Sequence, residues 1–241
     1  MIDVRQEVRR TVVVVPVHNE ELLLDTCLTA LSGAAAQLEQ TGVDTELVVV
    51  LDSCTDSSED IAVTWADKTG LTVVRVDRRN VGAARAAGFF SARSSSRRTP
   101  LSDVWFATTD ADSAVSPTWL ASQLAHAARG ADVVAGTVLP DLESASPALA
   151  LAYDSGYRHR PGHRHVHGAN LGLRASAYWS VGGFGALTTA EDVDLVRRLE
   201  HAAVPVLYAS DSPVRTSSRT EGRAPDGFAG HLRGLELAIA Q

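Results

Sequence analysis

The chain alternates continuous apolar runs with amphipathic segments, and no other feature limits its fold as strongly. The apolar runs lie at 12–15, 47–51, 71–76 and 103–109. Runs without a polar alternation are typical of parallel strands that are covered on both faces. The segments between them carry the apolar spacing of helices, over 22–38, 61–66 and 80–91. Four strands that alternate with three helices predict an α/β fold, with a mostly parallel central sheet flanked by helices.

The second half of the chain is less regular. Its predicted elements are two helices and two strands, at 117–129, 191–202, 133–139 and 204–208. An excursion rich in proline, glycine and histidine occupies 140–168, and a basic tail, predicted to be flexible, begins at about 211. With 241 residues, 45% of them hydrophobic, the chain can build one substantial core. We expect a single domain whose two halves are 1–113 and 114–241.

Composition disfavours several classes of protein. The net charge is −7 and the isoelectric point is about 5.6, so the chain lacks the basic surface of a general nucleic-acid binder. Cys27 and Cys54 are the two cysteines and form no CxxC pair, which disfavours a disulfide framework or a zinc ribbon. No apolar run reaches the ~18 residues of a membrane span. We expect a cytoplasmic protein with no integral membrane segment, for which peripheral membrane contact stays open.

The sequence TTDADS (108–113) places two carboxylates, Asp110 and Asp112, at the end of the fourth predicted strand. Ligands of open α/β sheets bind beyond the carboxyl ends of the strands. Two neighbouring acids repel each other unless a cation intervenes, and they suit a hard divalent ion that also binds phosphates. The alternatives are acids that only cap a turn, and a phosphatase-type aspartate nucleophile. The phosphatase type usually carries its pair after the first strand, which disfavours it here.

Five segments together resemble glycosyltransferase family 2, whose members have the GT-A fold. They are VVVVPVHNEE (12–21), VVVLDSCTDSS (48–58), NVGAARAAG (80–88), TTDADS (108–113) and AEDVDL (190–195). Each segment is a weak signal alone, but all five occur in the order and approximate spacing of the family. The resemblance implies an enzyme that moves a sugar from a nucleotide-sugar (a UDP-, GDP- or dTDP-sugar) to an acceptor hydroxyl.

The resemblance also implies how the donor is bound. The turn from Pro16 through His18 to Glu20, together with Asp52, would hold the base and ribose of the nucleotide. Asp110 and Ala111 would lie against the donor, and Asp112, with Asp110, would bind Mg²⁺ or Mn²⁺ on its diphosphate. For Asp52 a helix cap is the alternative, although Asp56 could supply that cap instead.

Two further residues are expected to contact the donor from the helix after the third strand. Asn80 and Arg85 open this helix, and Gly82 between them lets a ligand approach the backbone closely. The spacing is not GxGxxG, which disfavours a dinucleotide-binding dehydrogenase. The alternative for Arg85 is a solvated helix residue.

The remaining predicted residues belong to the second half. By the resemblance, Asp192 is the base that takes the proton from the acceptor in an inverting reaction, and Asn170 lies below the donor sugar. An acid at this helix start could instead only complement the helix dipole. Arg219 or Arg223, in the basic tail, is predicted to bind the donor phosphates, because a guanidinium matches phosphate geometry.

A histidine cluster allows two interpretations. His163, His165 and His167 would share one strand face, as zinc ligands can, and His159 lies close by in sequence. With Arg158, Arg160 and Arg164 they could equally form a cationic patch near the acceptor, and Arg215, Arg219, Arg223, His231 and Arg233 form a second basic group. Zinc sites usually draw on more than one segment, which disfavours zinc. The acceptor stays unknown, and both an anionic and a lipid-linked molecule fit.

Two other functions compete with sugar transfer. A nucleotidyltransferase would carry a glycine-rich, basic loop after the first strand, where this chain has the acidic sequence PVHNEE. A nucleotide-sugar-binding module that has lost turnover stays open.

Overall fold

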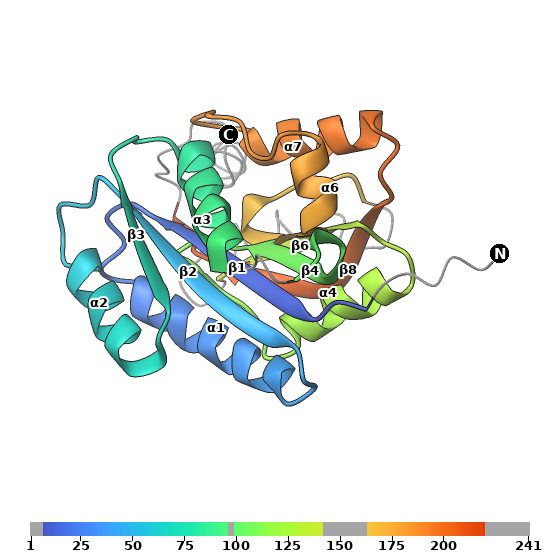
Figure 1. The fold of residues 1–241 in the computed structure, drawn as a ribbon. Coiled ribbons are helices and arrows are strands. Elements are labelled where there is room, and N and C mark those ends of the chain that lie inside the picture. The colour runs from blue at the N-terminus through green and yellow to red at the C-terminus, as the bar shows by residue number, and fades with distance from the viewer. Residues whose placement is uncertain (1–6, 96–98, 142–162, 220–241) are drawn as a thin grey trace, which may run out of the picture.

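The four strands predicted in the first half lie side by side in one sheet (Figure 1). The structure is a computed structural model and describes residues 7–95, 99–141 and 163–219. The first-half elements are β1 (Arg10–Val17), α1 (Leu24–Glu39), β2 (Asp44–Asp52), α2 (Ser58–Thr69), β3 (Thr72–Val76), α3 (Val81–Ser95), η1 (Leu101–Asp103) and β4 (Val104–Thr108). β1 pairs in parallel with β2 and β4, and β2 pairs in parallel with β3. The predicted α/β fold is confirmed.

The second half extends the same sheet. Its elements are β5 (Ser113–Ala114), α4 (Trp119–Ala128), β6 (Val133–Pro140), η2 (Gly168–Asn170), β7 (Leu171–Arg174), α6 (Ala175–Ser180), α7 (Glu191–His201) and β8 (Val206–Thr216). Within the described ranges the strand order is β3-β2-β1-β4-β7-β6-β8-β5. β7 is antiparallel to β4 and β6, and β5 is antiparallel to β8, while β6 and β8 pair in parallel. The sheet is therefore mostly parallel.

Two details of the prediction were wrong. β8 continues to Thr216, so residues 211–216, which we expected in a flexible tail, belong to a strand. Residues 214–216 pair with β6 from Val138 to Pro140, 215–216 also pair with β5, and these ladders hold the end of β8 in the sheet. Pro16 lies inside β1 rather than in a turn. Proline has no N–H to donate, and the pairing of β1 with β4 already ends at Val14, so the sheet loses nothing there.

Helices cover both faces of the sheet, as the continuous apolar runs predicted (Figure 1). α1, α2 and α4 lie on one face, where Val13, Val15 and Val17 of β1 enter their core. α3, α6 and α7 lie on the other, where Val12 and Val14 enter a second core. Each fully buried valine contributes ~1.5–3 kcal/mol to folding relative to an exposed one. A central strand between two cores gains on both sides, so an alternating pattern is not needed.

Strained residues mark the carboxyl edge of the sheet. Asn19, Ser53 and Arg79 follow β1, β2 and β3, and all three have φ between +46° and +55°. Ala190, directly before α7, has φ +56°. Such backbone costs of order 1–3 kcal/mol at a non-glycine residue and is concentrated at functional sites. Four of the five such residues in the described ranges thus lie in loops that carry predicted site residues, and the fifth, Ala203, lies between α7 and β8.

None of the helices in the described ranges combines the length and the apolar character that crossing a bilayer requires.

Candidate functional site

Arg85 lies at the centre of the acidic site. Its side chain, on α3, is only 2% exposed, so the alternative of a solvated residue is wrong. Its Nη2 lies 2.5 Å from Asp110 Oδ1, its Nη1 donates to the Glu191 carboxylate, and its Nε donates to Thr108 Oγ1 at 3.2 Å. Gly168 lies against the guanidinium, where a Cβ would come within 2.3 Å of Nη2. One arginine thus links the end of β4 to the start of α7.

Asp112, the second acid of the pair, has an arginine of its own. Arg219 Nη2 lies 2.7 Å from Asp112 Oδ2. The same nitrogen lies 2.8 Å from Glu20 Oε1, and Nη1 lies 3.1 Å from Glu20 Oε2. Burial and the neighbouring Asp110 carboxylate raise the pKa of Asp112 and Arg219 lowers it, so that the pKa is about 6. The structure therefore joins residues that follow β1, β4 and β8.

Asp192 lies at the start of α7, beside these pairs. Its Oδ2 accepts the backbone N–H of Gly168 at 2.6 Å, and its Oδ1 accepts that of Val193 at 2.7 Å. Burial raises the pKa of the Asp192 carboxyl, although Arg85 acts to lower it. The hydrogen bond from Val193 fits the alternative in which Asp192 only complements the helix dipole. The hydrogen bond from Gly168, which lies against the Arg85 guanidinium, also fixes the position of the Asp192 carboxylate.

Asp52 organises the loop that leads into α3. Its Oδ1 accepts the backbone N–H of Arg78 at 2.7 Å and of Arg79 at 2.8 Å, and its Oδ2 accepts that of Asn80 at 2.8 Å. Burial acts to raise the pKa of Asp52, but these hydrogen bonds lower it. Asn80 in turn accepts the Ala83 N–H at 2.9 Å and so caps α3. The Asp52 side chain is thus mostly occupied by the loop, with one lone pair of Oδ2 left to accept from a base or ribose.

The neighbouring turn follows the expected pattern. Asp56 Oδ1 accepts the Ser58 N–H at 3.0 Å, so Asp56 rather than Asp52 binds the start of α2, whose N-cap residue is Ser57. His18 Nδ1 lies 2.6 Å from the Asp52 carbonyl oxygen. Since a carbonyl can only accept, Nδ1 carries the proton, and Nε2 of the neutral ring is an acceptor.

Asn170 and Ala111 are placed differently from the other predicted residues. The Asn170 side chain is buried, its Oδ1 accepts the Trp119 indole N–H at 2.9 Å, and its Nδ2 donates to the carbonyls of Thr137 and Ser212. Contact with a sugar hydroxyl would break these hydrogen bonds, so Asn170 is not one of the residues of the proposed donor site. The Ala111 side chain is packed in the core beneath α1, which leaves only its backbone for a ligand.

The site is strongly negative. Two guanidiniums face five carboxylates, which are those of Glu20, Asp110, Asp112, Glu191 and Asp192. With all seven ionised, the net charge is −3. A nucleoside diphosphate would be repelled by this charge unless a further cation came with it.

The residues present fit a divalent cation. Among the described residues, no group of three or more His, Cys, Asp or Glu side chains forms a metal cage. Mg²⁺ needs none, since one or two carboxylates with water and substrate phosphates hold it in many enzymes. Asp112 already binds one positive group, the guanidinium of Arg219. Asp110 and Asp112 would hold such an ion.

The three histidines of the cluster that the structure describes, His163, His165 and His167, do not form a zinc site. His163 is buried, its Nε2 donates to the Ala209 carbonyl oxygen at 2.9 Å, and its Nδ1 accepts the His165 N–H at 3.1 Å. Both of its nitrogens are therefore used. The rings of His163, His165 and His167 are stacked, with centroids 5.5 and 6.1 Å apart. The other cationic candidates (Arg158, His159, Arg160, Arg223, His231 and Arg233) lie outside the described residues.

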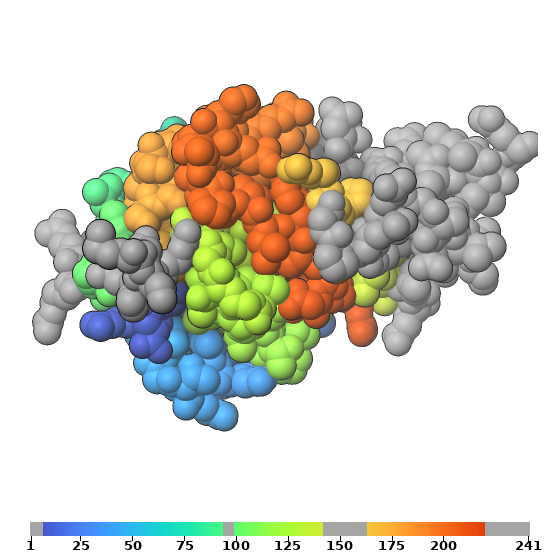
Figure 2. Space-filling model, turned by 90° about the vertical axis from the view of Figure 1, so that its right-hand side faces the viewer, coloured from blue at the N-terminus to red at the C-terminus, as the bar shows by residue number. Residues whose placement is uncertain are grey.

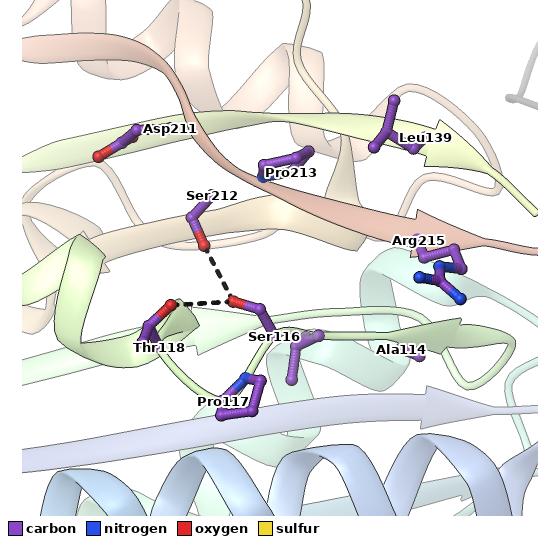
Figure 3. Close-up of a pocket in the computed structure, with 10 residues that line it drawn as sticks. Ala114, Ser116, Pro117, Thr118, Leu139, Asp211, Ser212, Pro213 and Arg215 are labelled. Carbon is purple, nitrogen blue, oxygen red and sulfur yellow. Dashed lines mark hydrogen bonds between the residues drawn. The ribbon is translucent and has the colours of Figure 1, made fainter.

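A pocket of about 620 Å³ opens next to β5, two residues beyond Asp112 (Figure 3). Its described lining comes from 114–118, 211–213, Leu139 and Arg215. Ser116 Oγ lies 3.3 Å from Thr118 Oγ1 and 3.5 Å from Ser212 Oγ across the pocket. Figure 2 shows the surface of α4 (yellow-green) next to that of β8 (red) on this side of the molecule. The acidic residues above are not part of this lining, so the pocket is separate from them.

The sequence contained little signal for several of these partners. Glu20 and Arg219 are 199 residues apart, and Arg85 and Glu191 are 106 residues apart. Neither a periodicity nor a spacing relates such positions. Thr108, the first residue of TTDADS, and Gly168, two residues before Asn170, were also missed as partners of Arg85.

The family model for glycosyl transferase family 2 matches residues 12–147, which is more than half of the chain. No curated protein matches the sequence. Among solved structures, TarS of S. aureus is similar with a TM-score of 0.65 at 16% identity, over 96% of this chain and 43% of that one. This chain thus spans less than half of TarS.

Two other solved structures share the fold. Mannosyltransferase PcManGT from Pyrobaculum calidifontis, in complex with GDP-Man and Mn²⁺, has a TM-score of 0.65 at 18% identity, over 97% of this chain and 70% of that one. GalNAc-T7 with UDP, GalNAc and Mn²⁺ has a TM-score of 0.63 at 14% identity, over 92% and 46%. The motif order, the family match and the shared fold agree: the chain belongs to glycosyltransferase family 2 and has the GT-A fold.

Proposed function

We propose that this protein transfers a glycosyl group from a nucleoside-diphosphate sugar to an acceptor hydroxyl, with inversion and with the help of a divalent cation. One observation carries the proposal. The two acids of the Asp-x-Asp pair and the acid expected to be the base are brought to one place, around Arg85 and Arg219. Family membership supports the reaction class.

The donor would bind along the carboxyl edge of β1, β2 and β4. His18 Nε2 and the remaining lone pair of Asp52 would face the nucleoside, and Asp110 and Asp112 would hold Mg²⁺ or Mn²⁺ against the diphosphate. The GDP-Man and UDP complexes of PcManGT and GalNAc-T7, both with Mn²⁺, support this choice of ligands. A bound divalent ion would neutralise charge that develops on the departing nucleoside diphosphate.

Asp192 would accept the proton of the acceptor hydroxyl as the new glycosidic bond forms. Its raised pKa makes it a stronger base than an exposed aspartate. The backbone N–H groups of Gly168 and Val193 each hold one oxygen of the Asp192 carboxylate in place, and Arg85 binds the neighbouring Glu191, so that a remaining lone pair of Asp192 would face the acceptor. A single base and direct displacement suffice for inversion, so no second carboxylate is needed as a nucleophile.

Turnover of UDP-, GDP- and dTDP-sugars with Mn²⁺ tests the proposal, with release of the nucleoside diphosphate to water as a readout that needs no known acceptor. Asp192→Asn is expected to lose about 10²–10⁴ in kcat, as for removal of a general base. Asp211→Asn is the matched control, because Asp211 binds His126 and Ser122 on another face and should leave kcat unchanged. If wild type and Asp192→Asn release nucleoside diphosphate equally fast, the assignment of the base is wrong.

A further inference from the structure

Arg219 makes an unusual contact for a residue near the end of the described chain. A single nitrogen, Nη2, lies between two acids, 2.8 Å from Glu20 Oε1 and 2.7 Å from Asp112 Oδ2. Both acids are buried, with side chains 7% and 11% exposed. Two buried carboxylates that face one point cannot both stay ionised without a cation between them. The guanidinium occupies the position of that cation.

From this geometry we infer that Arg219 neutralises Asp112 before a divalent ion binds, and that the guanidinium and the divalent ion compete for this carboxylate. The inference rests on the proposed function, since it concerns the same ion. Arg219 is the positive partner of Asp112 Oδ2 among the described residues, and a divalent ion bound there would repel a guanidinium 2.7 Å away. Binding of the ion and withdrawal of Arg219 are then one event.

The structure allows this withdrawal at little cost. Arg219 is three residues beyond the end of β8, and its side chain is 36% exposed. The segment is anchored before it, where the Ser217 N–H donates to the Asp112 carbonyl oxygen at 3.1 Å. Rotation of the long arginine side chain therefore suffices, and β8 stays in the sheet. Glu20 accepts hydrogen bonds from both Nη atoms of Arg219 and can hold the guanidinium near the site after it leaves Asp112.

The exchange also gives Arg219 a second position. Released from Asp112, a guanidinium held at the edge of the site can bind the diphosphate of the donor, for which its fork geometry is suited. The same arginine would thus protect the acids before the donor arrives and bind the donor afterwards.

The affinity for Mn²⁺ alone, measured by the EPR signal of the free ion, tests the competition in the full chain. Arg219→Gln is expected to bind Mn²⁺ about fivefold or more tightly than wild type, the lower end of ordinary coupling between two binding events. Arg215→Gln is the matched control, because it removes the same charge from β8 at a residue that lines the separate pocket. It should bind Mn²⁺ as wild type does.

Arg219→Lys keeps the positive charge but cannot form the two parallel hydrogen bonds that arginine donates to Glu20. It should therefore also tighten Mn²⁺ binding, but by less than Arg219→Gln does. It serves as the test if the glutamine variant does not fold. Unchanged or weaker Mn²⁺ binding on removal of Arg219 overturns the inference, as does equal tightening in Arg215→Gln or no Mn²⁺ binding by any of the proteins.

Turnover of sugar nucleotides, measured separately, keeps the two proposals apart. Turnover with an unchanged Mn²⁺ affinity in Arg219→Gln refutes the exchange and leaves the transferase standing. Tighter Mn²⁺ binding without any turnover refutes the transferase alone.

Discussion

Each acid of the Asp-x-Asp pair is compensated by its own arginine. Asp110 pairs with Arg85 of α3, and Asp112 pairs with Arg219 beyond β8. The two like charges, which lie two positions apart in the sequence, are therefore compensated in the structure. Neither the Arg85–Asp110 pair nor the Arg219–Asp112 pair could be recognised in the sequence. The acids themselves could be, because a strand end followed by Asp-x-Asp is a local pattern. Their partners come from other elements and depend on the tertiary fold.

Replacement of Arg85 by methionine is expected to destabilise the protein by about 3–5 kcal/mol, because Glu191 would become a buried charge without its partner. Arg75→Met is the matched control. Arg75 pairs with Glu59 at the surface, where both side chains are about half exposed, and its loss should cost at most ~1 kcal/mol. Urea unfolding of the two variants measures the difference. Equal losses would show that the Arg85 pairs contribute no more than a surface ion pair.

Asp112 gives a pH dependence of known sign. Its pKa in the folded protein, about 6, lies above the ordinary value of 3.8, so its contribution to stability is present below 3.8 and is lost as the pH rises through 6. Asp112→Asn avoids this loss and is expected to raise Tm at pH 7.5. The advantage should shrink at pH 4.5, where the wild-type carboxyl is mostly protonated in the fold. Thermal unfolding in EDTA at both pH values measures it, and a lower Tm for Asp112→Asn at both would contradict the raised pKa.

At the scale of elements, the site depends on how closely α3 approaches the loop before α7. Gly82, in the first turn of α3, donates its N–H to the Leu187 carbonyl oxygen at 3.2 Å. A Cβ at this position would lie 2.1 Å from the carbonyl oxygen of Gly185. Glycine at position 82 lets α3 come close enough for Arg85, about one turn later in the same helix, to bind Glu191.

Gly82→Ala is expected to cost about 1–3 kcal/mol, because backbone atoms of two elements would have to move apart. Gly33→Ala, in the middle of α1, is the control: nothing lies within 4 Å of its added Cβ, and alanine should gain ~0.5–1 kcal/mol as the better helix former. Chemical denaturation gives both values. A neutral Gly82→Ala would show that α3 and the 185–187 loop are not tightly packed.

The elements that sequence patterns predicted are those whose own residues determine them. The valine run of β1 and the leucine spacing of α1 lie within each element's own residues, and both elements were predicted within a few residues. Leu22, which the helical pattern included, lies before α1 and is 88% exposed, because α1 begins only at Leu24. β5 and β7 are two and four residues long and gain their stability from pairing with distant strands. No pattern within so short a segment could predict them, nor the extension of β8.

For the molecule as a whole, the sheet brings separate loops to one edge. The residues that follow β1, β2, β4 and β8 and those that begin α3 and α7 meet there, and positive φ values at Asn19, Ser53, Arg79 and Ala190 show that the backbone is strained to do so. Family and fold could be predicted from the order of five motifs. The direct donor contacts expected of Arg85 and Asn170 could not be judged from sequence, because a buried and a ligand-facing side chain look the same there.

We propose that this edge of the sheet binds a nucleotide-sugar through a divalent ion on Asp110 and Asp112. Thermal unfolding with UDP-, GDP- and dTDP-sugars, each with and without Mn²⁺, tests it most directly, since a ligand at 100 times its Kd stabilises by ~2.7 kcal/mol. We expect a rise in Tm of roughly 5–10 °C with at least one donor, only when Mn²⁺ is present, and none in Asp112→Asn. No Mn²⁺-dependent rise with any donor, or the same rise in Asp112→Asn, would contradict it.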